Sequence, residues 1–287
     1  MLSLAASVAS SVAVSVLLKI ARRRFIEVDQ AIAVNYPVAA LLCLALLRPE
    51  PSQLLQPGTP WWVLILLSLL LPGIFLAMAG AVRHAGIIVS DAAQRLSLLI
   101  PLAAAFWLFG EAFTATKLTG MAVALAALGC LLWPPARPAG GAPSARHSRG
   151  GAAALLLCVW LGYGMIDILF KQMARSAVDF SSSLLAAFML AGLFMGAWLL
   201  IRRTAWRRRS VAAGVLLGAL NFSNIYFYLV AHQQYPDNPT LVFAAMNIGV
   251  ISLGTLTGAW IFKESLGPRK LAGVVLAMAS VAMLVPR

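Results

Sequence analysis

The sequence predicts an all-α polytopic membrane protein with ten transmembrane helices, arranged as two inverted five-helix repeats. Three observations lead to this prediction. The 287-residue chain is 61% hydrophobic and only 11% charged, whereas a soluble domain is about 45–50% apolar and about 25% charged. Its apolar stretches are long enough to cross a bilayer. One stretch near the middle of the chain also occurs again at its end.

The repeated stretch is Trp107 to Leu132, which aligns without a gap on Trp260 to Val285, 153 residues later. Chance matches of Ala and Leu are common in such a chain, so the scarce residue types decide the case. These agree: Trp107 with Trp260, Glu111 with Glu264, and Lys117 with Lys270. A period near half the chain length indicates one unit built twice.

Turn residues and basic residues separate the apolar stretches from one another. We expect helices near residues 2–20, 29–47, 61–82, 87–109, 117–133, 152–171, 180–201, 210–231, 241–262 and 270–285. At about 1.5 Å per residue, these lengths match a hydrocarbon core of about 30 Å. The first stretch has its positive charges after its apolar core and none before it, which favours a membrane span over a cleaved signal.

A Pro-, Gly- and Arg-rich link at 134–150 divides the chain into a first repeat, 1–133, and a second, 151–287. Because each repeat has an odd number of helices, the second must enter the membrane the other way up. Sixteen Lys and Arg residues lie in one set of alternate loops and five in the other. The positive-inside rule then predicts a cytoplasmic link and non-cytoplasmic termini in an inner (plasma) membrane.

Two similar motifs lie at the ends of the halves: Phe109-Gly110-Glu111 with Gly120 and Gly129, and Phe262-Lys263-Glu264 with Gly273. Together with the Leu-Ile-Pro-Leu run at 99–102, they resemble the drug/metabolite transporter superfamily, in its ten-helix EamA-like branch. Gly254 departs from the pattern, which has a second Pro there. The resemblance implies secondary transport, by export, of a small organic metabolite such as an amino acid, with alternating access around a central site.

Two charged pairs with four-residue spacing lie inside predicted helices. Asp91 and Arg95 share a helix face, and Arg95 is about 12 Å into its helix, near the midplane. Either the two form a buried ion pair, or Arg95 binds an anionic group such as a carboxylate in a water-filled cavity. Asp167 and Lys171 form a second pair, either solvated or functional. Asp91 and Asp167 are the candidates for coupling transport to protons.

Glu111 and Glu264 lie at helix junctions near a membrane face. A carboxylate there can accept hydrogen bonds from the free N–H groups of the following helix and interact favourably with its dipole. We therefore expect both to be structural and not proton carriers.

Neutral polar residues gather at midplane depth on several predicted helices. Unpaired amides are costly in hydrocarbon, so these side chains need protein partners or a cavity. We predict one shared polar cavity at the repeat interface, and of Tyr226 and Tyr228 only one can face it. The predicted substrate-binding residues are Arg95, Asn35, Tyr36, Gln94, Tyr163, Asn221, Asn224 and Asn247.

Enzyme and cofactor signatures are absent from the sequence. It contains no nucleophile elbow, phosphate loop or dinucleotide fingerprint, and its three Cys and three His residues have no metal-ligand spacing. We expect a small-molecule substrate and membrane lipid as partners, no nucleic acid, no cofactor and no metal, in a chain compatible with a monomer. A flippase of a lipid or lipid-linked carrier is the alternative function, and a membrane-embedded enzyme a weaker one.

Overall fold

The structure is a computed structural model that describes residues 2–21, 26–97, 99–100, 103–104, 115–132, 145–174, 176, 178–235, 239–264 and 266–284. These residues form ten α-helices and no strand. The helices are α1 (Leu2–Ala21), α2 (Val28–Leu47), α3 (Trp61–His84), α4 (Ile87–Leu96), α6 (Ala115–Leu132), α7 (Ala145–Ala174), α8 (Phe180–Ile201), α9 (Arg208–Gln234), α10 (Pro239–Leu256) and α11 (Pro268–Leu284). A short 3₁₀ helix, η2 (Pro51–Leu55), follows α2, and a π-helical turn, η3 (Thr257–Ile261), continues α10.

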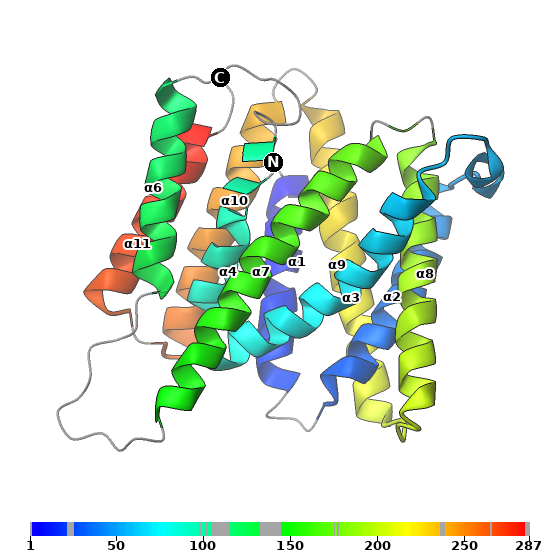
Figure 1. Ribbon diagram of the computed structural model, residues 1–287, viewed down its shortest axis with the longest axis horizontal. Helices are drawn as coiled ribbons and strands as arrows, with labels where there is room; N and C mark the ends of the chain where they lie inside the picture. The colour runs from blue at the N-terminus through cyan, green and yellow to red at the C-terminus, as the bar shows by residue number, and fades with distance from the viewer. Residues whose placement is uncertain are drawn as a thin grey trace.

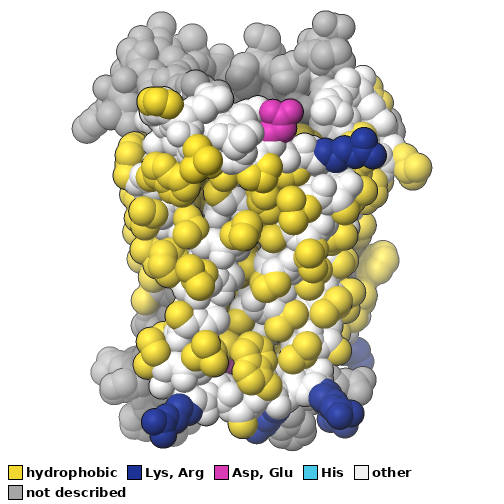
Figure 2. All heavy atoms as spheres, turned by 90° about the vertical axis from the view of Figure 1, so that its right-hand side faces the viewer, with side chains coloured by type: hydrophobic (Ala, Val, Ile, Leu, Met, Phe, Trp, Pro, Cys, Tyr) yellow, Lys and Arg dark blue, Asp and Glu magenta, His cyan; other side chains and the backbone are white. Residues whose placement is uncertain are grey.

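Six of the described helices are long and apolar enough to cross a membrane, namely α1, α2, α3, α8 and the apolar parts of α7 and α9. Large apolar side chains on them face outward, such as Trp62, which is 63% exposed, and Leu193, which is 64% exposed. In Figure 2 apolar side chains cover the middle of one face, with Lys and Arg toward its two ends. The prediction of an all-helical, membrane-type architecture is therefore confirmed.

Helices from the two halves of the chain alternate in the bundle. Helix α2 packs against α8 and α9, α1 against α9 and α10, α3 against α7 and α8, α4 against α7 and α10, and α6 against α11. Helix α1 begins and α11 ends toward the upper edge of Figure 1, while α7 begins at the lower edge. No described helix is therefore confined to contacts within its own half of the chain.

Most of the predicted helices agree with the structure to within a few residues. Helix α7 differs, because it begins at Ala145, inside the predicted link 134–150. Helix α4 is described as Ile87–Leu96, and most of the rest of the predicted helix 87–109 lies outside the described residues, as does Glu111.

Glycines set the closest approaches between helices. A Cβ atom on Gly218 would lie 2.7 Å from the backbone oxygen of Asn35, so α9 and α2 approach too closely there for a side chain. A Cβ atom on Gly254 would lie 2.6 Å from Oδ2 of Asp91. The absence of a side chain at Gly254 thus lets α10 pack directly against α4.

Candidate substrate cavity

A cavity of about 540 Å³ lies among α1, α3, α4, α7, α8, α9 and α10. Its volume is within the range of about 300–1,000 Å³ that is usual for small-molecule sites. The lining is largely apolar, with polar groups from five of these helices, α1, α4, α7, α9 and α10. The polar lining residues are Ser11, Ser15, Gln94, Arg95, Ser97, Tyr163, Asp167, Asn221, Asn224, Tyr228 and Asn247. The lining residues of α7 come from its second half, which ends at the upper edge of Figure 1, and those of α3 come mainly from its second half, which ends toward the lower edge. The cavity therefore lies in the middle part of the bundle.

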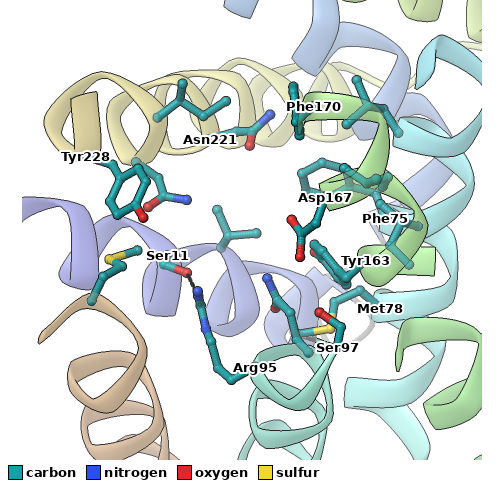
Figure 3. A pocket seen from close by; sticks show the side chains of 18 of the residues that line it. Ser11, Phe75, Met78, Arg95, Ser97, Tyr163, Asp167, Phe170, Asn221 and Tyr228 are labelled. Carbon is teal, nitrogen blue, oxygen red and sulfur yellow. Dashed lines mark hydrogen bonds between the residues drawn. The ribbon is translucent and has the colours of Figure 1, made fainter. Parts of the chain in front are cut away.

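Arg95 is the cation of this cavity. Its Nη2 donates to Oγ of Ser11 at 2.9 Å, and its Nη1 donates to Oδ1 of Asn247 at 3.5 Å. Figure 3 shows the guanidinium extending from α4 toward Ser11. Its Nε is buried and has no hydrogen-bond partner among the residues that the structure describes. Since a guanidinium has five N–H donors, it retains capacity for an anionic ligand.

Asp91 lies one turn before Arg95 on α4 but is not among the lining residues. It is 2% exposed, and its Oδ1 accepts a hydrogen bond of 2.7 Å from Oγ of Ser15. Within the described part of the chain no ion pair joins it to Arg95, so the first of the two alternatives, a buried ion pair between these residues, is not observed. The physical reason is that α1 offers Ser11 and Ser15 at the same four-residue spacing, and each charged group bonds its own serine.

Helix α1 carries a stripe of polar residues at every fourth position, which we call the α1 stripe: Ser3, Ser7, Ser11, Ser15 and Lys19. Ser3 donates to Oε1 of Gln234 at 2.6 Å, and Ser7 donates to Oδ1 of Asn224 at 2.9 Å. A four-residue step turns about 40° beyond a full helical turn. The stripe therefore winds around α1, from α9 at its start to α4 further along. Sequence reasoning missed Ser11 and Ser15, although the regular spacing of serines was a usable signal.

Asp167 and Tyr163 lie one turn apart on α7 and both line the cavity. Figure 3 shows the Asp167 carboxylate projecting into the cavity from a different helix than Arg95. The predicted partner of Asp167, the side chain of Lys171, lies outside the described residues. The predicted residues Gln94, Asn221, Asn224 and Asn247 line the cavity as well.

Asn35 and Tyr36 do not line the cavity, in contrast to their prediction. Both are fully buried at 0% exposure. Oδ1 of Asn35 accepts a hydrogen bond of 3.2 Å from the lining residue Asn221. The Tyr36 ring packs at centroid distances of 6.5 and 6.4 Å from the lining residues Phe75 and Phe188. The two residues support the lining from behind, because depth along a helix does not determine which face meets the cavity.

Glu264 closes the lower end of the bundle. Its Oε1 lies 2.6 Å from Nζ of Lys19 and accepts a hydrogen bond of 2.8 Å from the backbone N of Ile87. Its Oε2 accepts one of 3.3 Å from the N of Ile88. We predicted a structural cap on the following helix; the carboxylate instead caps α4, to which the η3 turn brings it close. Gly86 leaves room for it, since a Cβ there would lie 2.5 Å from Oε2.

A second hollow of about 910 Å³ lies at this lower end, between the last turns of α1 and α3 and the first turn of α2. Its walls include Leu18 and Lys19 on α1, and Ala79 and Arg83 on α3. The two hollows are therefore lined by successive turns of the same two helices.

Comparison with known proteins gives a relative and a fold. No family model matches the chain. A Haemophilus influenzae protein described as uncharacterized is 45% identical over 279 residues, which cover 96% of this chain and 94% of that protein. One crystal structure is similar in fold, with a TM-score of 0.58 and 16% identity over 97% of this chain and 96% of the other. By its sequence, the chain belongs to the same family as the Haemophilus influenzae protein.

Proposed function

We propose that the protein is a multi-pass secondary transporter of a small organic metabolite, such as an amino acid, that works by alternating access around the central cavity. The observation that carries the proposal is Arg95, a half-buried cation in a ligand-sized cavity, whose buried Nε has no hydrogen-bond partner among the described residues. Charges at such depth in membrane proteins are costly and usually belong to substrate or ion pathways. The export direction and membership of the EamA-like branch come from the sequence resemblance.

The helix contacts support an inverted repeat. Taken in chain order, the helices of the two halves pair as α1 with α7, α2 with α8, α3 with α9, α4 with α10 and α6 with α11. When each helix is replaced by its counterpart, the contact of α1 with α9 corresponds to the contact of α7 with α3. Both contacts are present in the structure. The contacts of α2 with α9 and of α1 with α10 also have their counterparts, α8 with α3 and α7 with α4. We propose ten spans in two such halves, with the cavity between them.

The cavity chemistry supports an amino acid with a large apolar side chain. The Arg95 guanidinium suits a carboxylate, and the Asp167 carboxylate suits an ammonium group. Aromatic rings of Phe75, Phe170 and Phe188 also line the cavity and offer apolar surface to a side chain.

Counterflow in proteoliposomes tests this function. Vesicles loaded with an unlabelled amino acid are expected to accumulate the labelled form, across a panel that includes L-phenylalanine and L-leucine. Arg95→Ala should strongly weaken the exchange, whereas Leu193→Ala, which changes an outward-facing residue, should keep it. Absence of exchange for every amino acid, carboxylic acid and amine tested would reject the proposal. Movement of a fluorescent phospholipid between leaflets in the same vesicles would favour a flippase instead.

We also propose that the lower end is cytoplasmic and the termini lie on the opposite side, from the distribution of Lys and Arg. Single cysteines at exposed Ser52, in η2, and exposed Arg203, between α8 and α9, probe the two ends. In a chain without native cysteines, an impermeant maleimide added to intact cells should label the Ser52→Cys variant. The Arg203→Cys variant should react only after permeabilisation, and the reverse pattern would invert the topology.

A further inference from the structure

We propose that Asp91 holds an exchangeable proton, which passes between its carboxyl group and the cavity through the hydroxyl of Ser15. The proton-binding site itself follows from local geometry. Its use in coupling rests on the proposed transport function.

The burial of Asp91 argues against a carboxylate anion. The side chain is 2% exposed, and among the described residues Ser15 is its one hydrogen-bond donor. Oδ2 is buried and has no partner in this part of the chain. An isolated carboxylate in a low-dielectric interior is strongly destabilised and takes up a proton instead. A neutral carboxyl group needs no counter-ion.

The space around Oδ2 suits a proton better than a metal cation. A Cβ atom on Gly254 would lie 2.6 Å from Oδ2, so the backbone of α10 already covers this oxygen. A hard metal cation requires several oxygen ligands at about 2.0–2.6 Å. The backbone of α10 at Gly254 fills the space beside Oδ2 in which such a cation and its other ligands would lie. A proton requires no additional volume.

The charged and titratable groups around Asp91 have other hydrogen-bond partners or line the cavity. Arg95, on the same helix, bonds Ser11 and faces the cavity. Glu264, beyond η3, is held by Lys19 of α1 and by the N-terminus of α4. On α7, Asp167 and Tyr163 line the cavity. None of these groups forms an ion pair with Asp91 in the described structure.

Ser15 connects the carboxyl group to the cavity. Its hydroxyl lies 2.7 Å from Oδ1 of Asp91, and the same residue contributes to the cavity lining. For release, the Ser15 hydroxyl first rotates so that its proton points to a cavity water and its oxygen can accept from Asp91. The carboxyl proton on Oδ1 then moves to Oγ of Ser15 while the hydroxyl proton of Ser15 moves to that water. Ser15 ends with the one proton it began with, Asp91 becomes a carboxylate, and the water becomes hydronium. Uptake is the reverse.

Infrared spectroscopy of the reconstituted protein tests the site without any substrate. Near neutral pH the wild type is expected to show the C=O stretch of a protonated carboxyl group, with a shift in D₂O. Asp91→Asn should remove this band, and Asp167→Asn should leave it. A wild-type spectrum without the band, or a band that survives Asp91→Asn, would overturn the proposal.

Ser15→Ala provides a second test of the proposal if the Asp91→Asn variant does not fold. Loss of the hydrogen bond should move the band to higher frequency and slow its exchange of hydrogen for deuterium. Ser7→Ala is the matched control, because Ser7 belongs to the α1 stripe but bonds Asn224, and it should change neither property. An unshifted band in Ser15→Ala with unchanged exchange would refute the relay. Counterflow of L-phenylalanine in the same wild-type preparation reports on transport separately, so failure of one proposal is distinguishable from failure of the other.

Discussion

The lower end of the α1–α4 contact and the cavity above it differ in how fully their charged groups are hydrogen-bonded. At the lower end Glu264 accepts hydrogen bonds from Lys19 and from two backbone N–H groups of α4. In the cavity Arg95 bonds two neutral side chains and retains a buried, unpartnered Nε among the described residues. Buried polar groups in folded proteins are normally satisfied, and exceptions call for a reason. The difference fits a lower end that serves stability, and it supports the proposal that the cavity binds a ligand.

The largest effect on stability is expected from Glu264→Ala. Removing one member of a largely buried ion pair typically costs about 3–5 kcal/mol, and the side chains of Lys19 and Glu264 are only 19% and 11% exposed. The variant also loses the cap of α4. We expect the free energy of unfolding to fall by about 3 kcal/mol, measured by denaturant unfolding of the purified protein in detergent.

The matched control at the same end is Glu27→Ala. Glu27 lies 3.0 Å from Arg207, but these side chains are 47% and 56% exposed, and such surface pairs contribute about 0–1 kcal/mol. Equal losses in the two variants would show that the Glu264 cluster is an ordinary surface pair.

A smaller effect on stability and a larger one on binding are expected from Arg95→Ala. The variant loses two hydrogen bonds but also removes a half-buried charge that no ion pair compensates among the described residues. Hydrogen bonds to charged groups contribute about 1.5–3 kcal/mol, so binding of a carboxylate substrate should weaken roughly ten- to hundredfold. Unfolding and counterflow are measured on the same preparation. If the variant unfolds as readily as Glu264→Ala yet transports normally, Arg95 is a structural residue. The proposed difference between the lower end and the cavity would then be wrong.

The smallest effect is expected from Tyr228→Phe. Tyr228 lines the cavity, whereas Tyr226 is not among the lining residues and stacks on Phe222 at a centroid distance of 6.1 Å. Loss of one neutral hydroxyl contact, worth about 0.5–1.5 kcal/mol, should reduce counterflow affinity roughly two- to tenfold. Tyr226→Phe should behave as the wild type, and an equal loss there would place the substrate elsewhere.

Charge and polarity inside apolar helices were sufficient to predict most of the cavity. Arg95, Asn224 and Asn247 are conspicuous because each is expensive in hydrocarbon. Asn35 and Tyr36 satisfied the same criterion but face neighbouring helices. Their orientation depends on how α2 packs against α8 and α9, and no helical period within α2 alone reports that packing.

The function of Glu264 shows a second limit of the sequence. Its structural role as a helix cap was predictable from its place at a helix junction. The capped helix was not, because α4 lies 177 residues away in the chain from Glu264. Ser11 and Ser15 were missed for the opposite reason: single serines in apolar helices are common, and only their shared four-residue spacing distinguishes them.

The wall between the cavity and the lower hollow also has an electrical consequence. On α1, Ser15 faces one hollow and Leu18 the other, a separation of about 4.5 Å along the helix axis. If each hollow fills with water from its own side of the membrane, most of the membrane voltage would fall across the protein between them, because water conducts far better than protein. An elementary charge that crosses 100 mV changes its energy by about 2.3 kcal/mol. A charged solute or proton that crosses this single helical turn would therefore be driven by voltage as well as by its concentration gradient.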